Sequence, residues 1–185
     1  MKHKMSKKVL CLCMVAVLAI GLAIPTFAGT AHSALNGTVK HYRAVSSNGT
    51  TGFLNLYPSN GVVKNGTPLK SWTYSTSSDQ YFKVDVLSSG HAFLRVQTAP
   101  TSGAGGQYSL LLNRSTNGNA IVWDEATGAR DSALQIDYYS SASTVLFNLS
   151  HYAGQRLQCP ASGSVPNGTQ FIFTTATGDQ TGWVF

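Results

Sequence analysis

Few residues in this chain have the types and spacing that catalysis requires. Asp124 and Glu125 are adjacent, so on a strand their side chains would point to opposite faces. A glycosidase needs two carboxylates that face each other across one bond, and this pair does not meet that requirement. The histidines beyond residue 28 show neither metal-ligand spacing nor a nucleophile motif: His32, His41, His91 and His151. We therefore expect no enzyme, no metal centre and no cofactor.

The first 28 residues have the layout of a secretory signal peptide. Four lysines precede an uncharged stretch over residues 9–24, and the small residue Ala28 stands at the cleavage position. The apolar stretch is short for a bilayer span, which takes about 20 residues, although an uncleaved anchor is the alternative. We expect a secreted, extracellular domain of residues 29–185 with no membrane contact after signal cleavage.

Signal cleavage would also change the charge of the protein. The full chain has 13 Lys and Arg against 7 Asp and Glu, and residues 29–185 keep nine basic and seven acidic residues, a net charge of +2. The basic residues are scattered singly, so nucleic-acid binding gets no support. Cys159 would be the one remaining cysteine, which excludes an intrachain disulfide. A reactive thiol is conceivable there, but a buried apolar role is more typical of such a cysteine.

Two sequence markers recur in the same order at a period near 50 residues. One is an Asn-Gly pair that leads into an apolar run, at Asn65, Asn117 and Asn167. The other is an aspartate followed by a polar residue, at Asp79-Gln80, Asp131-Ser132 and Asp179-Gln180. We therefore divide the domain into three repeats, about 39–90, 91–143 and 144–185.

Each repeat has the pattern of short strands. Segments such as "FLNLY" and "YFKVDVL" alternate apolar with polar residues, and Asn-Gly or Ser-Gly clusters separate them. No segment beyond residue 28 has a sustained helical period. About four strands per repeat, with the N-terminal strand beside the C-terminal one, would close the structure. This pattern predicts an all-β fold, a β-trefoil of three pseudo-symmetric four-stranded repeats, with no helix beyond the signal.

The order of these markers resembles that of the ricin B-type lectin family. In that family an aromatic-led strand, a glycine, an aromatic strand and a Gln-x-Trp follow one another. Here "YRAVSSNGTTGFLNL", Gly66, "PLKSW" and "DQYF" have the same order, and the resemblance extends from about Val39 to the end. It implies a non-catalytic carbohydrate-binding module whose partners are glycans or polysaccharides. We expect it to be a monomer.

The resemblance also assigns structural roles. The Gln of Gln-x-Trp ties off backbone groups within each lobe, and the aromatic residue fills the core. The corresponding pairs are Gln80 with Phe82 and Gln180 with Trp183. The second repeat departs from this pattern, because it has Ser132 and Leu134 at these positions.

Sugar binding in the family uses three elements per repeat. These are an acceptor on the first strand, an aromatic ring that stacks on the sugar, and a polar residue just before the Gln. The matching residues are Asn55, Trp72 and Asp79 in the first repeat, Ser109, Trp123 and Asp131 in the second, and Gln158, Phe173 and Asp179 in the third.

No repeat keeps the family's aspartate on the first strand. Asn55 and Gln158 accept hydrogen bonds more weakly than a carboxylate, and Ser109 has a short reach. Turn capping is the alternative role for the three aspartates, and core packing is the alternative for Trp72. Because the first repeat keeps the most complete set, we expect a surviving site there.

A secreted inhibitor or protein-binding module is the competing function. β-Trefoils also inhibit proteases through an exposed loop, and residues 97–107 form the longest polar loop of this chain. The fold alone does not choose between these functions.

Overall fold

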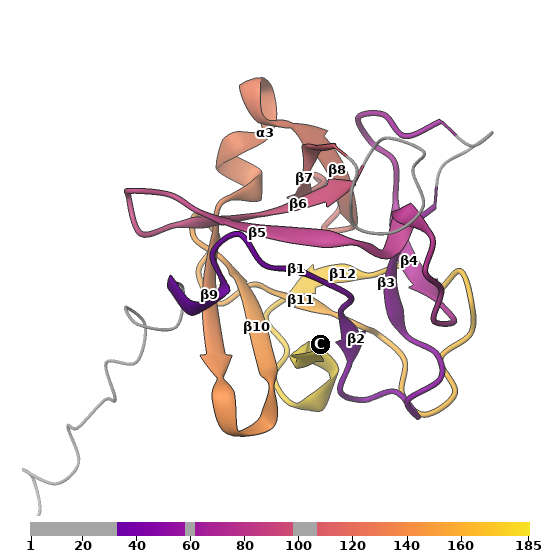
Figure 1. Ribbon diagram of the computed structural model, residues 1–185. Coiled ribbons are helices and arrows are strands. Elements are labelled where there is room, and N and C mark those ends of the chain that lie inside the picture. Colours follow the sequence, from indigo (N-terminus) through magenta and orange to yellow (C-terminus); the bar gives the residue numbers. More distant parts are fainter. Residues whose placement is uncertain (1–32, 58–61, 98–106) are drawn as a thin grey trace, which may run out of the picture.

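The computed structural model describes residues 33–57, 62–97 and 107–185, apart from the side chains of Ser141 and Asp179, and strands dominate it (Figure 1). The strands are β1 (Val39–Lys40), β2 (Arg43–Ala44), β3 (Phe53–Leu56), β4 (Leu69–Trp72), β5 (Phe82–Val86), β6 (Ala92–Gln97), β7 (Tyr108–Arg114), β8 (Ala120–Asp124), β9 (Leu134–Tyr139), β10 (Thr144–Leu149), β11 (Arg156–Gln158), β12 (Ile172–Thr174) and β13 (Trp183–Val184). The helical elements are η2 (Ser78–Gln80), α3 (Glu125–Ser132), η3 (Ser140–Ala142) and η4 (Asp179–Thr181).

A closed ring of antiparallel strands forms the body of the molecule. Around the ring, β1 pairs with β5, then β6, β9, β10 and β13 follow, and β13 pairs with β2. Because β1 and β2 are two pieces of one N-terminal segment, this last pairing closes the barrel. Its register places Trp183 opposite Ala44 and Val184 opposite Arg43. The predicted contact between the first and last strands is confirmed.

Three hairpins extend from the barrel, and they meet with threefold regularity. The hairpins are β3–β4, β7–β8 and β11–β12, and their first strands pair with β2, β6 and β10. Three isolated bridges join them to one another: Pro68 with Ile121, Asn119 with Ile172, and Lys70 with Gln170. Equivalent residues are spaced by 51 positions in two sets: 68, 119 and 170, and 70, 121 and 172. This spacing agrees with the period near 50 that the sequence markers predict.

The core fills the barrel and the space under the hairpins. Strand residues alternate between this core and the outside, as in β10, where Val145, Phe147 and Leu149 are buried. Aromatic side chains occupy its centre: Phe171 and Trp183 pack edge to face at 5.1 Å, and the Trp183 indole donates a hydrogen bond to Leu157 O at 3.2 Å. The Trp183 indole can be buried without an unpaired polar atom, because its Nε1 has this hydrogen-bond partner.

The predicted Asn-Gly turns connect these strands. Gly66 and Gly168, which follow Asn65 and Asn167, have φ of +85° and +87°. A side chain at these angles would be strained, so the hairpin turns require glycine. The Asn60–Gly61 pair lies outside the described residues, as do residues 98–106 of the long polar loop.

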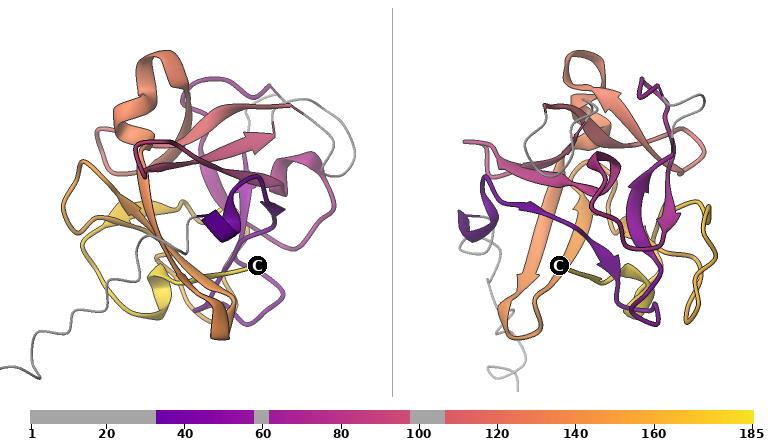
Figure 2. Two further views of the ribbon diagram at one scale, coloured as in Figure 1. Left: turned by 60° about the vertical axis from the view of Figure 1, so that its left-hand side comes forward. Right: turned by 45° about the vertical axis from the view of Figure 1, so that its right-hand side comes forward.

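The expectation of no helix beyond the signal is wrong, because α3 follows β8 and projects from the body of the molecule (Figure 2). Asp124 caps this helix by accepting a hydrogen bond from Thr127 N at 2.9 Å. Glu125 in the first turn and Arg130 in the last turn suit the helix dipole. A helix of eight residues is too short to show a clear helical period of apolar residues, so the sequence pattern did not predict it. No helix in the described part of the chain is long and apolar enough to cross a membrane.

Replacement of Tyr42 by Phe should stabilise the fold by about 1 kcal/mol, because the buried Tyr42 hydroxyl has no hydrogen-bond partner among the described residues. The ring would keep its edge-to-face contact with Phe147 at 5.1 Å.

Burial raises the pKa of Tyr42 above its unfolded value, so wild-type stability falls as pH rises past about 10. Urea unfolding at neutral pH and near pH 10.5 should show that Tyr42→Phe loses less stability over this range. A variant less stable than the wild type at neutral pH would contradict the prediction.

Candidate functional site

Each hairpin has a buried amide side chain at the same position of its first strand. The cross-strand register pairs Asn55 with Lys70, Asn113 with Ile121, and Gln158 with Ile172. These three amides are 4%, 4% and 7% exposed. The structural counterpart of Asn55 in the second repeat is therefore Asn113. Ser109, the predicted counterpart, lies exposed four residues earlier on β7, so this prediction is wrong.

The three amides tie the hairpins to the turns that end each repeat. Gln80 Nε2 donates to Asn55 Oδ1 at 3.0 Å, Asn113 Nδ2 donates to Ser132 Oγ at 2.9 Å, and Gln158 Nε2 donates to Gln180 Oε1 at 2.6 Å. We call these three contacts the amide ties. They direct polar atoms of Asn55 and Gln158, two of the predicted sugar acceptors, toward partners inside the protein.

Gln80 is the best-satisfied member of the amide ties. It is fully buried, donates to Thr73 O at 2.8 Å as well as to Asn55, and accepts from Ser75 N at 2.8 Å. The neighbouring Phe82 is also fully buried, as is Trp183 in the third repeat. The η2 turn, which carries Asp79, is thereby fixed against the β3–β4 hairpin.

A shallow concavity lies above the first amide tie. Asn55, Leu56, Tyr57, Trp72 and Asp79 line it, and its volume is about 270 Å³. Trp72 is half-buried at the end of β4, and its ring lies 5.6 Å from that of Tyr57, which is 40% exposed. The predicted Trp72 and Asp79 therefore face one hollow, and Tyr57 joins them. Tyr57 is not among the predicted site residues, although an aromatic residue directly after a buried strand is a usable sequence signal.

The second repeat has a larger concavity at the equivalent place. Its volume is about 390 Å³, and its lining includes Asn113, Arg114, Trp123, Thr127 and Asp131. Trp72 pairs with Phe53, two residues before Asn55, and Trp123 pairs with Leu111, two residues before Asn113. The two indoles therefore occupy equivalent positions. The two hollows are thus pseudo-symmetric, and each combines an indole with a carboxylate.

Helix α3 holds Trp123 in place. The indole Nε1 donates to Thr127 Oγ1 at 2.8 Å. A Cβ on Gly128 would lie 2.7 Å from Trp123 Cδ1, so only glycine permits this close approach of the helix. The ring is therefore fixed before any ligand arrives.

The carboxylate of Asp131 lies at the other side of this hollow. It accepts a hydrogen bond from the Tyr152 hydroxyl at 2.6 Å, which raises the pKa of Tyr152. The guanidinium of Arg114 lies 4.8 Å from the Tyr152 ring centre. Asp124, by contrast, serves structure: its hydrogen bonds from Asn65, then from Thr127, lower the pKa of its carboxyl group.

The third repeat lacks the aromatic element. Phe173 is 5% exposed and packs in the core, so it is unavailable for stacking on a sugar. The residue in register with Trp72 and Trp123 is Thr174, which lies opposite Arg156. The side chain of Asp179 lies outside the described part of the structure. The third predicted set is therefore not assembled as the sequence suggested.

The remaining candidate groups do not form a reactive centre. Cys159 is buried, its thiol donates to Ala161 O at 3.3 Å, and burial raises its pKa. Among residues 33–57, 62–97 and 107–185, no three His, Cys, Asp or Glu side chains gather as metal ligands would.

Comparison with solved structures decides the architecture. The chain is similar to the Rhizoctonia solani agglutinin, with a TM-score of 0.59, 18% identity, and 82% of this chain and 95% of the other covered. It is also similar to the β-trefoil lectin of the Vibrio vulnificus hemolysin/cytolysin, solved with N-acetyl-D-lactosamine, with a TM-score of 0.52, 15% identity, and 80% and 92% covered. The fold is a β-trefoil.

The same trefoil occurs in a Macrolepiota procera ricin B-like lectin solved with lactose, which has a TM-score of 0.52, 13% identity, and 80% and 94% covered. The predicted β-trefoil fold is thereby confirmed, and its structural neighbours include a lectin of the ricin B-like kind that the sequence resembles. Neither a protein-family model nor a curated protein matches the sequence.

Replacement of Gln80 by Ala should destabilise the trefoil by roughly 1–3 kcal/mol, because it leaves the Asn55 amide and the Thr73 carbonyl without their partner. Gln135→Ala is the matched control, since Gln135 lies exposed on β9. Chemical denaturation of both variants gives the two free energies. Equal stability of the two variants would show that this amide tie contributes little.

Proposed function

We propose that this protein is a non-catalytic carbohydrate-binding module with two sugar sites, one in the first repeat and one in the second. A single observation carries the proposal: an indole and a carboxylate face the same hollow at pseudo-equivalent positions, Trp72 with Asp79 and Trp123 with Asp131. The sequence favoured the first repeat alone. With Asn113 rather than Ser109 opposite Ile121, the second set is equally complete.

This pairing suits the chemistry of sugars. A pyranose presents an apolar C–H face, which packs on an aromatic ring, and hydroxyl groups at its edge, which donate to a carboxylate. Tyr57 adds a second ring in the first hollow, and Arg114 adds hydrogen-bond donors in the second. Both hollows are open, so each site should bind weakly. Two sites on one rigid domain would strengthen attachment to a polymer by avidity.

The fold neighbours suggest which sugars to try first. The Macrolepiota procera lectin was solved with lactose and the Vibrio vulnificus lectin with N-acetyl-D-lactosamine. Both ligands contain galactose, so we propose galactose-containing glycans as the first probes. A glycan array widens the search to other sugars.

Removal of either indole should weaken glycan binding at its own hollow, and removal of both should weaken it at both hollows. Stacking of a sugar on an aromatic ring is comparable to other aromatic contacts, so each single change should cost about 1 kcal/mol of binding, close to a fivefold loss. Titration calorimetry with lactose on the wild type, Trp72→Ala, Trp123→Ala and the double variant measures this.

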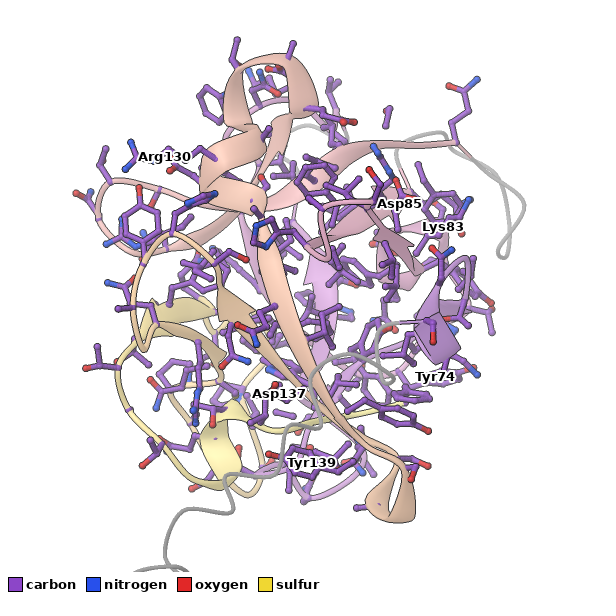
Figure 3. All side chains as sticks on the ribbon, turned by 90° about the vertical axis from the view of Figure 1, so that its left-hand side faces the viewer. Tyr74, Lys83, Asp85, Arg130, Asp137 and Tyr139 are labelled. Atoms are coloured by element: carbon purple, nitrogen blue, oxygen red, sulfur yellow. The ribbon has the colours of Figure 1, made fainter. Side chains whose placement is uncertain are left out.

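Tyr139→Ala is the control, because Tyr139 is 52% exposed, lines neither hollow and lies away from α3 (Figure 3). Thermal melts of every variant separate lost binding from lost folding. If Trp72→Ala lowers the melting temperature sharply but keeps binding, Trp72 is a packing residue and its site is misassigned. Absence of binding to any glycan, together with inhibition of a protease, would favour the competing inhibitor function.

We also propose that the protein is exported and loses residues 1–28. The basic, apolar and small-residue segments in that order support this. Mass spectrometry of protein collected from the medium should give an N-terminus at Gly29. A chain that starts at Met1 would contradict the proposal.

A further inference from the structure

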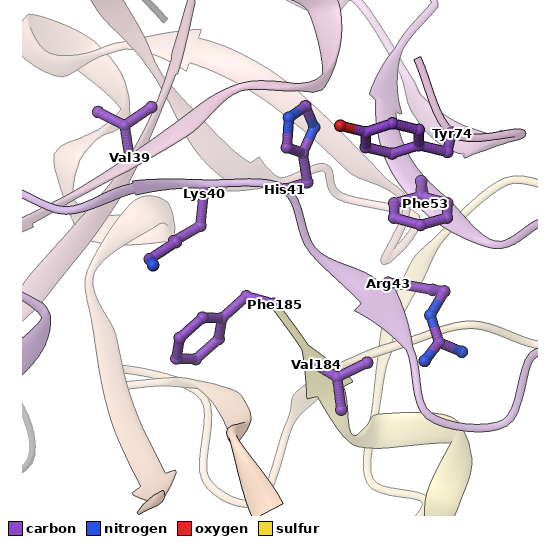
Figure 4. A pocket seen from close by; sticks show the side chains of 8 residues that line it. All are labelled: Val39, Lys40, His41, Arg43, Phe53, Tyr74, Val184 and Phe185. Carbon is purple, nitrogen blue, oxygen red and sulfur yellow. The ribbon is translucent and has the colours of Figure 1, made fainter. Parts of the chain in front are cut away.

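A third hollow of the described surface lies apart from both proposed sugar sites. Its volume is about 450 Å³, within the range of small-molecule sites. It opens on the outside of the barrel, where the N-terminal segment passes from β1 to β2 beside the end of β13 (Figure 4). We call it the β1–β13 groove, and its lining is Val39, Lys40, His41, Arg43, Phe53, Tyr74, Val184 and Phe185.

No described side-chain carboxylate forms an ion pair with either cation of the β1–β13 groove, Lys40 or Arg43. Both ion pairs among the described residues belong to Arg95, which contacts Asp85 and Glu125. Lys40 and Arg43 therefore keep their charge available for a ligand. The Arg43 guanidinium is held in position, because its Nη1 donates to Ser47 Oγ at 3.0 Å. Two uncompensated cations on one hollow favour an anion.

Aromatic rings form much of the remaining wall. Phe53 and Tyr74 lie with ring centres 5.3 Å apart, and Tyr74 is 56% exposed. On the opposite wall, Lys40 Nζ lies 5.2 Å from the centre of the Phe185 ring. Figure 4 shows Lys40 beside Phe185, with Phe53, Tyr74 and Arg43 on the other side of the N-terminal segment. The groove thus combines charge with flat apolar surface.

His41 contributes a polar ring without a charge. It packs edge to face against Tyr74 at 5.1 Å and lies 4.2 Å from Tyr81. Burial lowers its pKa, although a backbone hydrogen bond with Gln80 opposes this shift, so its imidazole is neutral near pH 7. The ring therefore adds polar surface to the groove without adding charge.

We propose that the β1–β13 groove is a second class of binding site, specific for an acidic saccharide, a pyranose that carries a carboxylate or a sulfate. Lys40 and Arg43 bind the anionic group, and Tyr74 with Phe53 packs against the apolar face of the sugar ring. A simple anion would leave the rings uncovered, and a neutral sugar would leave the cations unpaired. An acidic saccharide would cover the aromatic rings and pair with the cations, and it fits the volume of the groove.

The site is independent of the two indole hollows, since it shares no lining residue with them. Titration calorimetry with tri-galacturonic acid, galactose 6-sulfate and neutral galactotriose tests it, on the wild type and on the Trp72→Ala/Trp123→Ala variant. At least one acidic probe should bind both the wild type and the double variant. The double variant should bind this probe about tenfold more tightly than it binds galactotriose. Added salt should weaken the binding of the acidic probe. The probe that binds identifies the anionic group as carboxylate or sulfate.

Point variants locate the binding. Lys40→Gln and Tyr74→Ala should each weaken the acidic probe by about fivefold to tenfold, because each removes one of the two kinds of contact. Lys64→Gln is the matched control, since it removes the same charge from an exposed loop residue outside the groove. The Lys40 side chain makes no hydrogen bond or ion pair with the described residues, and Lys40→Gln removes only its contact with the Phe185 ring, so the melting temperature should change little.

Three outcomes would overturn the proposal. Acidic binding that disappears in the double indole variant but persists in Lys40→Gln would place the ligand in the indole hollows. Equal loss in Lys40→Gln and Lys64→Gln would indicate attraction by overall charge. A hexaglutamate peptide that binds as tightly as the acidic sugars would exclude specificity for a saccharide.

Discussion

The architecture depends on the pairing of the first strand with the last. A six-stranded barrel leaves no unpaired edge only if β2 meets β13, and that contact consists of the short register of Ala44 and Arg43 with Trp183 and Val184. Trp183 lies at this seam with its indole bonded to Leu157 O, so the same residue closes the ring and fills the core. Strands from all three repeats then have fixed neighbours, and the hairpins that they carry must meet under the barrel with threefold regularity.

The amide ties convert this regular frame into specific surfaces. In each repeat a buried amide on the hairpin holds the turn that precedes the last strand, and that turn carries an aspartate. In the first two repeats the aspartate is thereby brought to the rim of a hollow beneath an indole. Helix α3 is a local variation on this plan. It replaces the short η2 type of turn, uses Ser132 where the first repeat uses Gln80, and fixes Trp123 through Thr127 and Gly128.

Charge is distributed differently over the barrel and the hairpins. Arg95 is neutralised by two carboxylates, whereas Lys40 and Arg43 at the β1–β13 groove have none within the described structure. The hollows on the hairpins each contain a carboxylate. Neutral hydroxyl-rich sugars therefore suit the hairpin hollows, and acidic sugars suit the barrel groove. One small domain would in this way present two kinds of site on a frame that does not need to move.

The sequence by itself determined the strand content, the period near 50 residues, the Asn-Gly turns and the closure of the first strand on the last. Each of these follows from local chemistry: alternation of apolar residues, positive φ at glycine, and a strand count that leaves one edge open. Trp72 and Asp79 could also be grouped, because two residues seven positions apart across one turn stay close in space.

Tertiary structure decided the features that depend on register or on packing between distant segments. Ser109 lies four residues from the true counterpart, Asn113. Degenerate repeats can be matched at several offsets in sequence, whereas the hydrogen-bonded register of the strands allows only one. Phe173 turned inward and Thr174 outward because a shift of one residue changes the face of a strand. Helix α3 needed Trp123 beneath Gly128, and the β1–β13 groove needed residues from both ends of the domain. These contacts exist only once the barrel is closed, so no local pattern could encode them.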